Sequence, residues 1–381
     1  MRRIAVLTTS RADYGLLRHL MRLAAADRAC RLLPIVCGSH LSRAHGMTVR
    51  ELEGDGFRPA ARVATVPRKD THAATARALG RALSRFASMF ERLRPDLLVV
   101  LGDRQELLSA CAAAVLLRLP IAHIHGGEAT EGVLDEQVRH AVSKLAHLHF
   151  PAAERYRRRL LRMGEDPQRV FNFGAPGLDA IARARALPRA ELERRLRFRL
   201  DGPLALLTLH PCALAGRPEP AEPVLRALDA EGLRVVATYA NADPGGARIN
   251  ARLERWALAH PERVVCAPSL GQDAYYSLVR LCSVVIGNSS SGIIEAPALK
   301  VPTVNIGRRQ DGRLRAPSVI DCPPDTAAVR RALRRALSPA FRRSRCRGVT
   351  PYGSGDVARR ILAVLKSAPL GEPLLRKSFH E

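Results

Sequence analysis

A run of histidines, glycines and carboxylates follows one apolar stretch of the chain and has the residue types of a proton-transfer site. Residues 121–128 read Ile-Ala-His-Ile-His-Gly-Gly-Glu, and Asp135 follows shortly after them. On a strand, alternation would put His123 and His125 on one face, and the glycine pair would let the backbone turn sharply. We therefore expect carboxylates such as Glu128 and Asp135 to donate and accept protons.

A metal site is the main alternative for these histidines. Two histidines at i and i+2 can share a metal, and His147 and His149 repeat that spacing. No third ligand follows at a recognisable distance. We therefore expect a site that uses no metal and no other cofactor.

A second group of polar residues ends the apolar run 97–101. The next residues are Gly-Asp-Arg, so a buried strand would deliver Asp103 and Arg104 to its carboxyl end. Asp103 fits acid–base chemistry, and it equally fits the N-cap of the following helix. Arg104 favours the charged carboxylate and burial favours the neutral form, so both roles stay open.

Phosphate-binding signals are strongest in the second half of the chain. The apolar run 284–286 leads into Gly-Asn-Ser-Ser-Ser-Gly at 287–292, which offers hydroxyls and free amides at a helix N-terminus. Glu295 lies about one turn further and could reach ribose hydroxyls. An ordinary serine cap is the alternative. Arg309 belongs to a cationic run at 307–313 that would add donors.

Three other strand ends carry polar residues. Ser10-Arg11-Ala12-Asp13 follows the first apolar run without a GxGxxG pattern, which disfavours dinucleotide binding there. Arg11 could bind phosphate, whereas Asp13 could simply cap the helix. Thr-Leu-His-Pro at 208–211 ends a strand with His210, and Asn241 lies in a turn at 239–246.

The elements that position these residues alternate as strand and helix through both halves. We predict strands at 4–9, 32–37, 97–102, 121–124, 147–150 and 170–173, then at 204–209, 235–239, 264–267, 284–286 and 303–306. We predict helices near 14–27, 72–93, 104–118, 135–146, 152–163, 177–186, 219–231, 246–259, 273–282, 291–299, 325–337 and 355–366. This rhythm indicates an α/β fold with parallel sheets, whose ligands bind at the strands' carboxyl ends.

A breaker-rich joint at 199–203 divides the chain into two Rossmann-like domains, 1–200 and 201–381. The second domain would bind nucleotide, and the active site would lie in an interdomain cleft. The last helix, about 355–366, could cross back to the first domain, and a loosely attached tail would follow it. A length of 381 residues suits two such domains.

Composition narrows the class of protein. The net charge is +25, but only five of the 61 basic residues are lysine, and many arginines fall on polar faces of predicted helices, such as 155, 157–159 and 162. This pattern favours a solvated surface over nucleic-acid binding.

No apolar run is long enough for a membrane span, and the N-terminal run is too short for a signal peptide. Eight cysteines without a CxxC pair indicate free thiols, and we expect a cytoplasmic protein.

Taken together, these motifs resemble the hydrolysing UDP-N-acetylglucosamine 2-epimerases of bacterial sialic-acid biosynthesis. The shared motifs are Ser-Arg-Ala-Asp-Tyr-Gly (10–15), Gly-Asp-Arg (102–104), His-Ile-His-Gly-Gly-Glu (123–128), Asp-Glu-x-x-Arg-His (135–140), Gly-Asn-Ser-Ser-Ser-Gly (287–292) and Asn-Ile-Gly-x-Arg-Gln-x-Gly-Arg (305–313). They keep their order and spacing from the first strand to about residue 366. The resemblance implies a GT-B-like fold and a homo-oligomer.

It also implies a reaction. The family removes the proton at sugar carbon 2 and expels UDP to give a 2-acetamidoglucal, and water then adds to release free N-acetylmannosamine. The resemblance implies catalytic roles for Asp103, Asp135 and His210. It and the strand-end positions together indicate that these residues bind the UDP-sugar: Arg11, Asp13, Arg104, Arg139, Asn241, Ser289, Ser290, Gly292, Glu295 and Arg309.

One position departs from part of the family. Other branches have Glu where this chain has His125, so either His125 or Glu128 takes over that role, and we expect Glu128 to do so. The nearest alternative substrate is UDP-2,4-diacetamido-2,4,6-trideoxyglucose. A non-hydrolysing epimerase is disfavoured, because that branch carries His-x-Glu-Ala-Gly. A glycosyltransferase shares the fold, which alone does not settle function.

Overall fold

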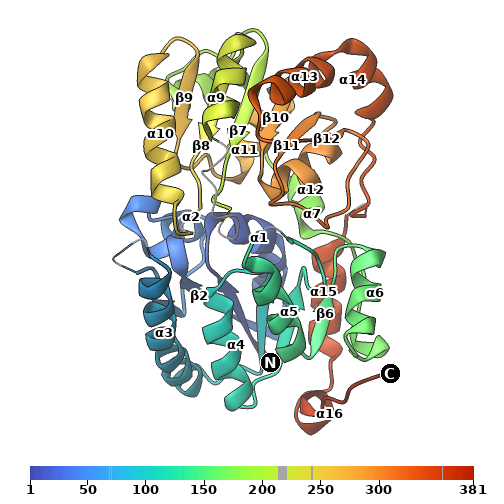
Figure 1. The fold of residues 1–381 in the computed structure, drawn as a ribbon. Helices are drawn as coiled ribbons and strands as arrows, with labels where there is room; N and C mark the ends of the chain where they lie inside the picture. Colours follow the sequence, from blue (N-terminus) through green and yellow to red (C-terminus); the bar gives the residue numbers. More distant parts are fainter. Residues whose placement is uncertain (68, 70, 132, 213–220, 242, 354) are drawn as a thin grey trace. The chain divides into compact units, whose positions relative to one another are not determined.

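The protein is described here from a computed structural model, which covers residues 1–67, 69, 71–131, 133–212, 221–241, 243–353 and 355–381. Its contacts divide the chain into two units (Figure 1). Unit 1 comprises Met1–Glu128, Leu134–Ala182 and Tyr352–Glu381. Unit 2 comprises Ala129–Val133 and Arg183–Pro351.

Unit 1 is built on a parallel sheet of six strands in the order β3-β2-β1-β4-β5-β6. Its strands are β1 (Arg2–Thr8), β2 (Cys30–Cys37), β3 (Ala61–Val63), β4 (Leu97–Leu101), β5 (Ile121–Ile124) and β6 (Leu148–Phe150). The central strand β4 is Leu-Leu-Val-Val-Leu and is buried along its whole length. Continuous apolar strands of this kind are typical of parallel sheets that are covered on both faces.

Helices cover both faces of this sheet (Figure 1). The helices of unit 1 are α1 (Arg11–Ala26), α2 (Val49–Gly54), α3 (His72–Leu93), α4 (Glu106–Leu116), α5 (Asp135–Leu145), α6 (Glu154–Arg162), α7 (Pro176–Arg183), α15 (Val357–Ser367) and α16 (Glu372–Leu375). Leu17 of α1 and Ile361 of α15 lie in one hydrophobic cluster with strand residues such as Val6. Phe86 of α3 and Val142 of α5 lie in a second cluster.

Unit 2 repeats the plan with the order β12-β11-β10-β7-β8-β9, again parallel. Its strands are β7 (Leu204–Thr208), β8 (Arg234–Thr238), β9 (Val264–Ala267), β10 (Val284–Gly287), β11 (Thr303–Ile306) and β12 (Val319–Cys322). Its helices are α8 (Arg189–Leu196), α9 (Ala221–Ala230), α10 (Gly246–Ala259), α11 (Gln272–Leu281), α12 (Ser290–Ala298), α13 (Thr326–Leu337) and α14 (Pro339–Arg345). The predicted start of α9 at residues 219–220 lies outside the described residues.

The two units depart from the expected domains 1–200 and 201–381 in three places, the first of which is Ala129–Val133 in unit 2. Residues 183–200 belong to unit 2, where Leu192 of α8 is buried and the Leu187 amide donates to Ser277 Oγ at 2.9 Å. Residues from Tyr352 onward belong to unit 1, because α15 buries Ile361 and Leu365 in the first sheet's core. The chain thus returns to its first sheet after building the second.

The C-terminal tail is held to unit 1, contrary to the expectation of a loose attachment. Lys377 Nζ lies 2.7 Å from a carboxylate oxygen of Glu165 and donates to the carbonyl of Lys144 at 2.7 Å. The Phe379 ring packs against Gly164, where a Cβ atom would come within 2.4 Å of it. These contacts anchor the last residues although they form no long element.

The predicted secondary structure needs correction at one strand and at six short elements of the described chain. Residues 170–173 form only one bridge, between Val170 and His149, because Phe171 and Phe173 pack on Phe150 instead of continuing a ladder. The short edge strands β3 and β12 and the helices α2, α8, α14 and α16 were not predicted. The cysteines are free thiols, as predicted. Of the helices that the structure describes, none is both long and apolar enough to span a membrane.

Candidate active site

In unit 1 the carboxyl ends of β4 and β5 bring three of the predicted catalytic residues together, namely Asp103, His125 and Glu128. Gly102 adopts a left-handed backbone with φ of 80°, and Asp103 follows it at the end of β4. The Asp103 carboxylate pairs with Arg139 Nη2 from α5. Arg139 is almost fully buried and also donates from Nη1 to the His125 carbonyl at 2.9 Å. One arginine therefore joins two strand ends.

His123 is a structural residue in this arrangement. Its Nε2 lies 2.7 Å from the Gly102 carbonyl and its Nδ1 lies 3.1 Å from Ser143 Oγ. Burial lowers the pKa of His123 to about 3, so the ring is neutral at physiological pH. Because a carbonyl only accepts, Nε2 carries the proton and Nδ1 accepts from the serine hydroxyl. His123 thus holds the turn that carries Asp103.

His125 leaves the strand instead of sharing a face with His123. Strand β5 ends at Ile124, and His125 has a left-handed backbone with φ of 63°, which is unusual for a residue with a side chain. Its Nδ1 pairs with the buried carboxylate of Glu128.

No group of three or more metal-ligating side chains occurs among the described residues.

Gly127 makes the turn between His125 and Glu128 possible. Its φ is 71°, and a Cβ atom there would lie 2.6 Å from the Tyr156 carbonyl oxygen and 2.8 Å from Leu160 Cγ. Both neighbours belong to α6, so the turn is pressed against that helix. Only glycine fits this position without strain.

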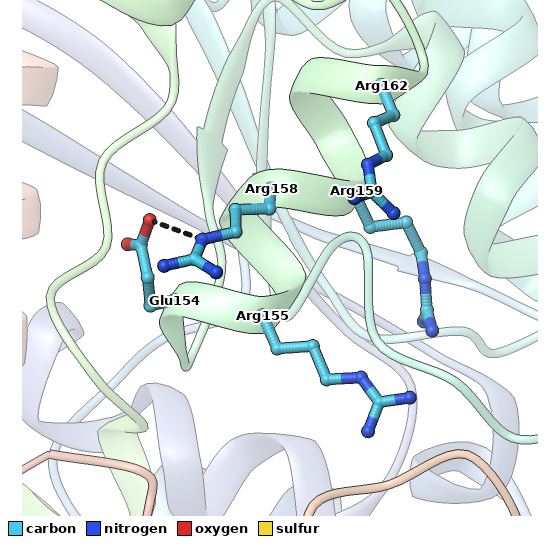
Figure 2. Close-up of a pocket in the computed structure, with 5 residues that line it drawn as sticks. All are labelled: Glu154, Arg155, Arg158, Arg159 and Arg162. Atoms are coloured by element: carbon cyan, nitrogen blue, oxygen red, sulfur yellow. Dashed lines mark ion pairs between the residues drawn. The ribbon is translucent and has the colours of Figure 1, made fainter.

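A pocket on α6 is lined by Glu154, Arg155, Arg158, Arg159 and Arg162 (Figure 2). Arg158 Nε pairs with Glu154 at 3.6 Å, and Arg155 and Arg162 are exposed, as expected for a solvated helix face. Arg159 differs from them, because its Nη1 donates to the Gly127 carbonyl at 2.9 Å. This bond links the arginine-lined face to the turn before Glu128.

At the end of β1, Asp13 caps α1. Its carboxylate accepts from the amides of Thr9 at 2.9 Å and Ser10 at 3.1 Å, and from the Ser10 hydroxyl at 2.8 Å. The capping box with the N-cap Ser10 is complete, so Asp13 has the structural role named as its alternative, and its role in substrate binding stays a prediction. Arg11 is half-buried at the first position of the helix.

Two buried residues near these strand ends were missed by the sequence analysis. Glu106 lies 3.6 Å from Arg104 and would touch a Cβ atom placed on Gly38. His40 hydrogen-bonds through both ring nitrogens, to Thr8 and Thr48, at 2.9 Å each, and burial lowers its pKa to about 4. The Gly-Ser-His run directly after the second predicted strand was the signal that could have found His40.

In unit 2 the predicted nucleotide-binding residues gather around Asn288. This side chain is buried and makes reciprocal hydrogen bonds with the His210 backbone, at 2.7 Å to its amide and 2.8 Å to its carbonyl. His210 Nδ1 accepts from the Asn241 amide at 3.1 Å, so a neutral His210 ring carries its proton on Nε2. His210 is therefore fixed in both position and tautomer.

The N-terminus of α12 has the expected form. Ser289 is the N-cap and accepts from the Ser291 amide at 3.4 Å. Gly292 lies against β11, where a Cβ atom would come within 2.8 Å of Thr303 Cγ2. Ser290 begins the helix, and Glu295, largely buried, lies further along it. A helix start of this kind offers amides and hydroxyls to an anion.

The loop after β11 supports the same turn. Arg309 Nη1 and Gln310 Nε2 both donate to the Asn288 carbonyl, at 3.2 Å and 2.8 Å. The Glu131 amide donates to the Asp311 carbonyl at 3.2 Å, so the segment that follows Glu128 in the sequence packs on this loop. Asp135, which starts α5 in unit 1, is half-buried. Gln310 was not predicted from the sequence.

Comparisons with known proteins show the family of the chain. The family model described as UDP-N-acetylglucosamine 2-epimerase matches residues 24–366. A hydrolysing UDP-N,N′-diacetylbacillosamine 2-epimerase of Legionella pneumophila is 36% identical over 380 residues and 99% of both chains. A hydrolysing GDP/UDP-N,N′-diacetylbacillosamine 2-epimerase of Campylobacter jejuni is 37% identical over 323 residues and 84% of both chains.

A solved structure shows the same fold. The UDP-GlcNAc 2-epimerase of Neisseria meningitidis, crystallised with UDP-GlcNAc, matches with a TM-score of 0.80 at 16% identity, over 96% of this chain and 99% of that one. The expected GT-B-like pair of Rossmann-like sheets is confirmed. From the extent of the family match and of the sequence identity, the chain belongs to the UDP-N-acetylglucosamine 2-epimerase family.

Proposed function

We propose that the protein is a hydrolysing 2-epimerase that converts a UDP-2-acetamido sugar and water into UDP and the free sugar inverted at carbon 2. The observation that carries this proposal is the linkage of Asp103, His125 and Glu128 by one buried arginine. Carbon-bound protons are weakly acidic, so their removal needs a fixed base and a stabilised leaving group. Both relatives described above are named as hydrolysing 2-epimerases.

In this proposal the residues serve either catalysis or substrate binding. Asp103 and Asp135 handle protons at the sugar, and His210 assists departure of UDP with the proton on its fixed Nε2. Ser289, Ser290 and Gly292 present the α12 N-terminus to phosphate. The other residues proposed to contact the substrate are Arg11, Arg104, Asn241, Glu295 and Arg309.

The preferred substrate in this proposal is UDP-N,N′-diacetylbacillosamine, which is UDP-2,4-diacetamido-2,4,6-trideoxyglucose. Support comes from the two relatives named for that sugar, one of which matches along 99% of both chains. UDP-N-acetylglucosamine, our first expectation from the sequence, is the second candidate, because the family description names it. The two sugars differ at carbons 4 and 6.

The test is to incubate the protein with each UDP-sugar separately and to identify the products by NMR. We expect UDP and a free sugar inverted at carbon 2, with the higher kcat/KM for the diacetamido sugar. A higher kcat/KM for UDP-N-acetylglucosamine would reverse the choice of substrate. A product that stays linked to UDP, or no product from either compound, would contradict the proposed function.

A further inference from the structure

The His125 ring is held by one nitrogen and leaves the other without a hydrogen-bond partner among the described residues. Nδ1 pairs with Glu128, whereas Nε2 is buried and makes no hydrogen bond in the described part of the chain. A carboxylate can only accept, so Nδ1 carries the proton and the neutral ring keeps a lone pair on Nε2. This is the tautomer of a base whose reactive atom is Nε2.

Both carboxylate oxygens of Glu128 face charged or ring groups of the protein, unlike Nε2 of His125. Its side chain has no exposed surface, one oxygen pairs with His125, and the other lies 3.9 Å from Arg139 Nη1. A fully buried carboxylate stays charged only where opposite charge compensates it, and Arg139 supplies that charge. Arg139 also binds the His125 carbonyl, which fixes ring and carboxylate relative to each other.

The backbone of His125 has a left-handed conformation that places its ring against Glu128. A left-handed φ of 63° on a residue with a side chain costs energy, and such outliers cluster at functional sites. Here the bend takes the ring out of the β5 alternation and onto Glu128. An arrangement in which a buried carboxylate orients an imidazole and stabilises its charged form is a recognised catalytic device.

We propose that His125 is a catalytic residue that accepts the proton from carbon 2 of the sugar, and that Glu128 is its positioning residue. This inference rests on the proposed function and reverses our expectation that Glu128 takes this role. The carbon 2–hydrogen bond breaks and the proton moves to Nε2. The freed electron pair forms the carbon 1–carbon 2 double bond while the carbon 1–oxygen pair leaves with UDP. The imidazolium later returns its proton to water.

Replacement by glycine tests this role without straining the backbone, since glycine suits the left-handed conformation at residue 125. We expect His125→Gly to bind UDP as the wild type does and to lose about 10²–10⁴-fold in kcat, the usual contribution of general acid–base catalysis. Added imidazole should enter the space left by the ring and restore activity in proportion to its free-base concentration. A structural role would not give such rescue.

Glu128→Gln separates positioning from catalysis. The amide oxygen can still accept from Nδ1, but it no longer stabilises the imidazolium, so kcat should fall at least about tenfold with KM little changed. Imidazole should not rescue this variant. The matched control is His140→Gln, a half-buried histidine paired with Glu136 at 3.0 Å on the same helix as Arg139, which should keep wild-type kcat.

The outcomes separate this inference from the proposed function. If the wild type releases no sugar from any UDP-sugar, the proposed function fails. If the wild type is active and His125→Gly keeps at least half its kcat, only the role of His125 fails. Loss of activity that imidazole does not restore, in a variant whose circular dichroism and UDP affinity match the wild type, also overturns the role.

Discussion

Arg139 connects the candidate catalytic residues of unit 1. It comes from α5, is almost fully buried, and contacts Asp103, Glu128 and the backbone of His125. The sequence also predicts that Arg139 binds substrate, and that role stays a prediction beside its contacts within the protein. Truncating a buried arginine of this kind would leave two carboxylates uncompensated.

Asp103→Asn tests the proposed acid–base role at the residue scale. The amide keeps the shape of the side chain and an oxygen for Arg139, so the fold and the affinity for UDP should be unchanged. Release of free sugar should fall by about 10²–10⁴-fold, because the amide cannot exchange a proton. Calorimetric titration with UDP and an assay of released sugar measure the two quantities. Wild-type turnover in this variant would contradict the assignment.

At the scale of elements, the turns that follow the strands position the candidate site residues more directly than the strands do. Strands β4, β5 and β10 were predicted within a residue or two, since a glycine (Gly102, Gly126 or Gly287) lies at the end of each strand or within two residues of it. Asp103, His125 and Asn288 follow those strands directly, so their neighbourhoods could be predicted. The partners Gln310 and Glu106 could not, because nothing local in the sequence marks which polar residues a loop or helix will bury.

Short and edge elements explain most of what the sequence missed. β3 has three residues and β12 has four, so neither shows enough alternation to stand out. Helix α8 reads as mostly charged, with Leu192 as its buried contact, and only packing in unit 2 reveals it. Because α8 packs in unit 2, the main segment of that unit begins at residue 183 and not at the predicted residue 201.

Gly127→Ala tests the turn that carries Glu128. A methyl group would meet the Tyr156 carbonyl and Leu160 of α6 on a backbone with positive φ, so we expect a loss of about 2 kcal/mol or more and a large loss of kcat. Gly80→Ala is the matched control. Gly80 lies in α3 with open space around it, and alanine there should stabilise by about 0.5–1 kcal/mol. Urea unfolding measures both, and equal effects would contradict the account.

The molecule as a whole returns its C-terminus to its first sheet and secures it around Glu165. This buried carboxylate contacts His149 at 2.9 Å, Lys144 at 2.6 Å and Lys377 of the tail at 2.7 Å. Burial works against its ionisation, but hydrogen bonds from His149, Lys144 and Lys377 outweigh burial and lower the pKa of Glu165 to about 2. The cluster joins β6, α5 and the last residues.

The depressed pKa of Glu165 predicts sensitivity to acid. Its ordinary pKa is 4.5, so its contribution is complete above that pH and is lost as the pH falls from 4.5 through about 2. We expect Glu165→Gln to lower the free energy of unfolding at pH 7 by about 3 kcal/mol and to flatten its decline in acid. Glu154→Gln, which removes exposed pairs only, should cost less than about 1 kcal/mol. Parallel acid declines in both variants would refute the role of Glu165.

The net charge of +25 is mostly a property of the surface. Arg155, Arg158 and Arg162 of α6 are exposed, whereas Arg139 and Arg309 are buried at the candidate sites of their units. The number of arginines therefore does not indicate the function, whereas the buried arginines mark the candidate sites. Both buried arginines lie within the motifs that resemble those of the family, at 135–140 and 305–313.

Turnover in D₂O tests the central claim most directly, because removal and return of the carbon 2 proton leave a record in the product. We predict that NMR of the released sugar shows one deuterium at carbon 2, inverted configuration there, and one UDP per sugar. A released sugar that keeps its hydrogen and its configuration at carbon 2 would show simple hydrolysis, and would contradict the account.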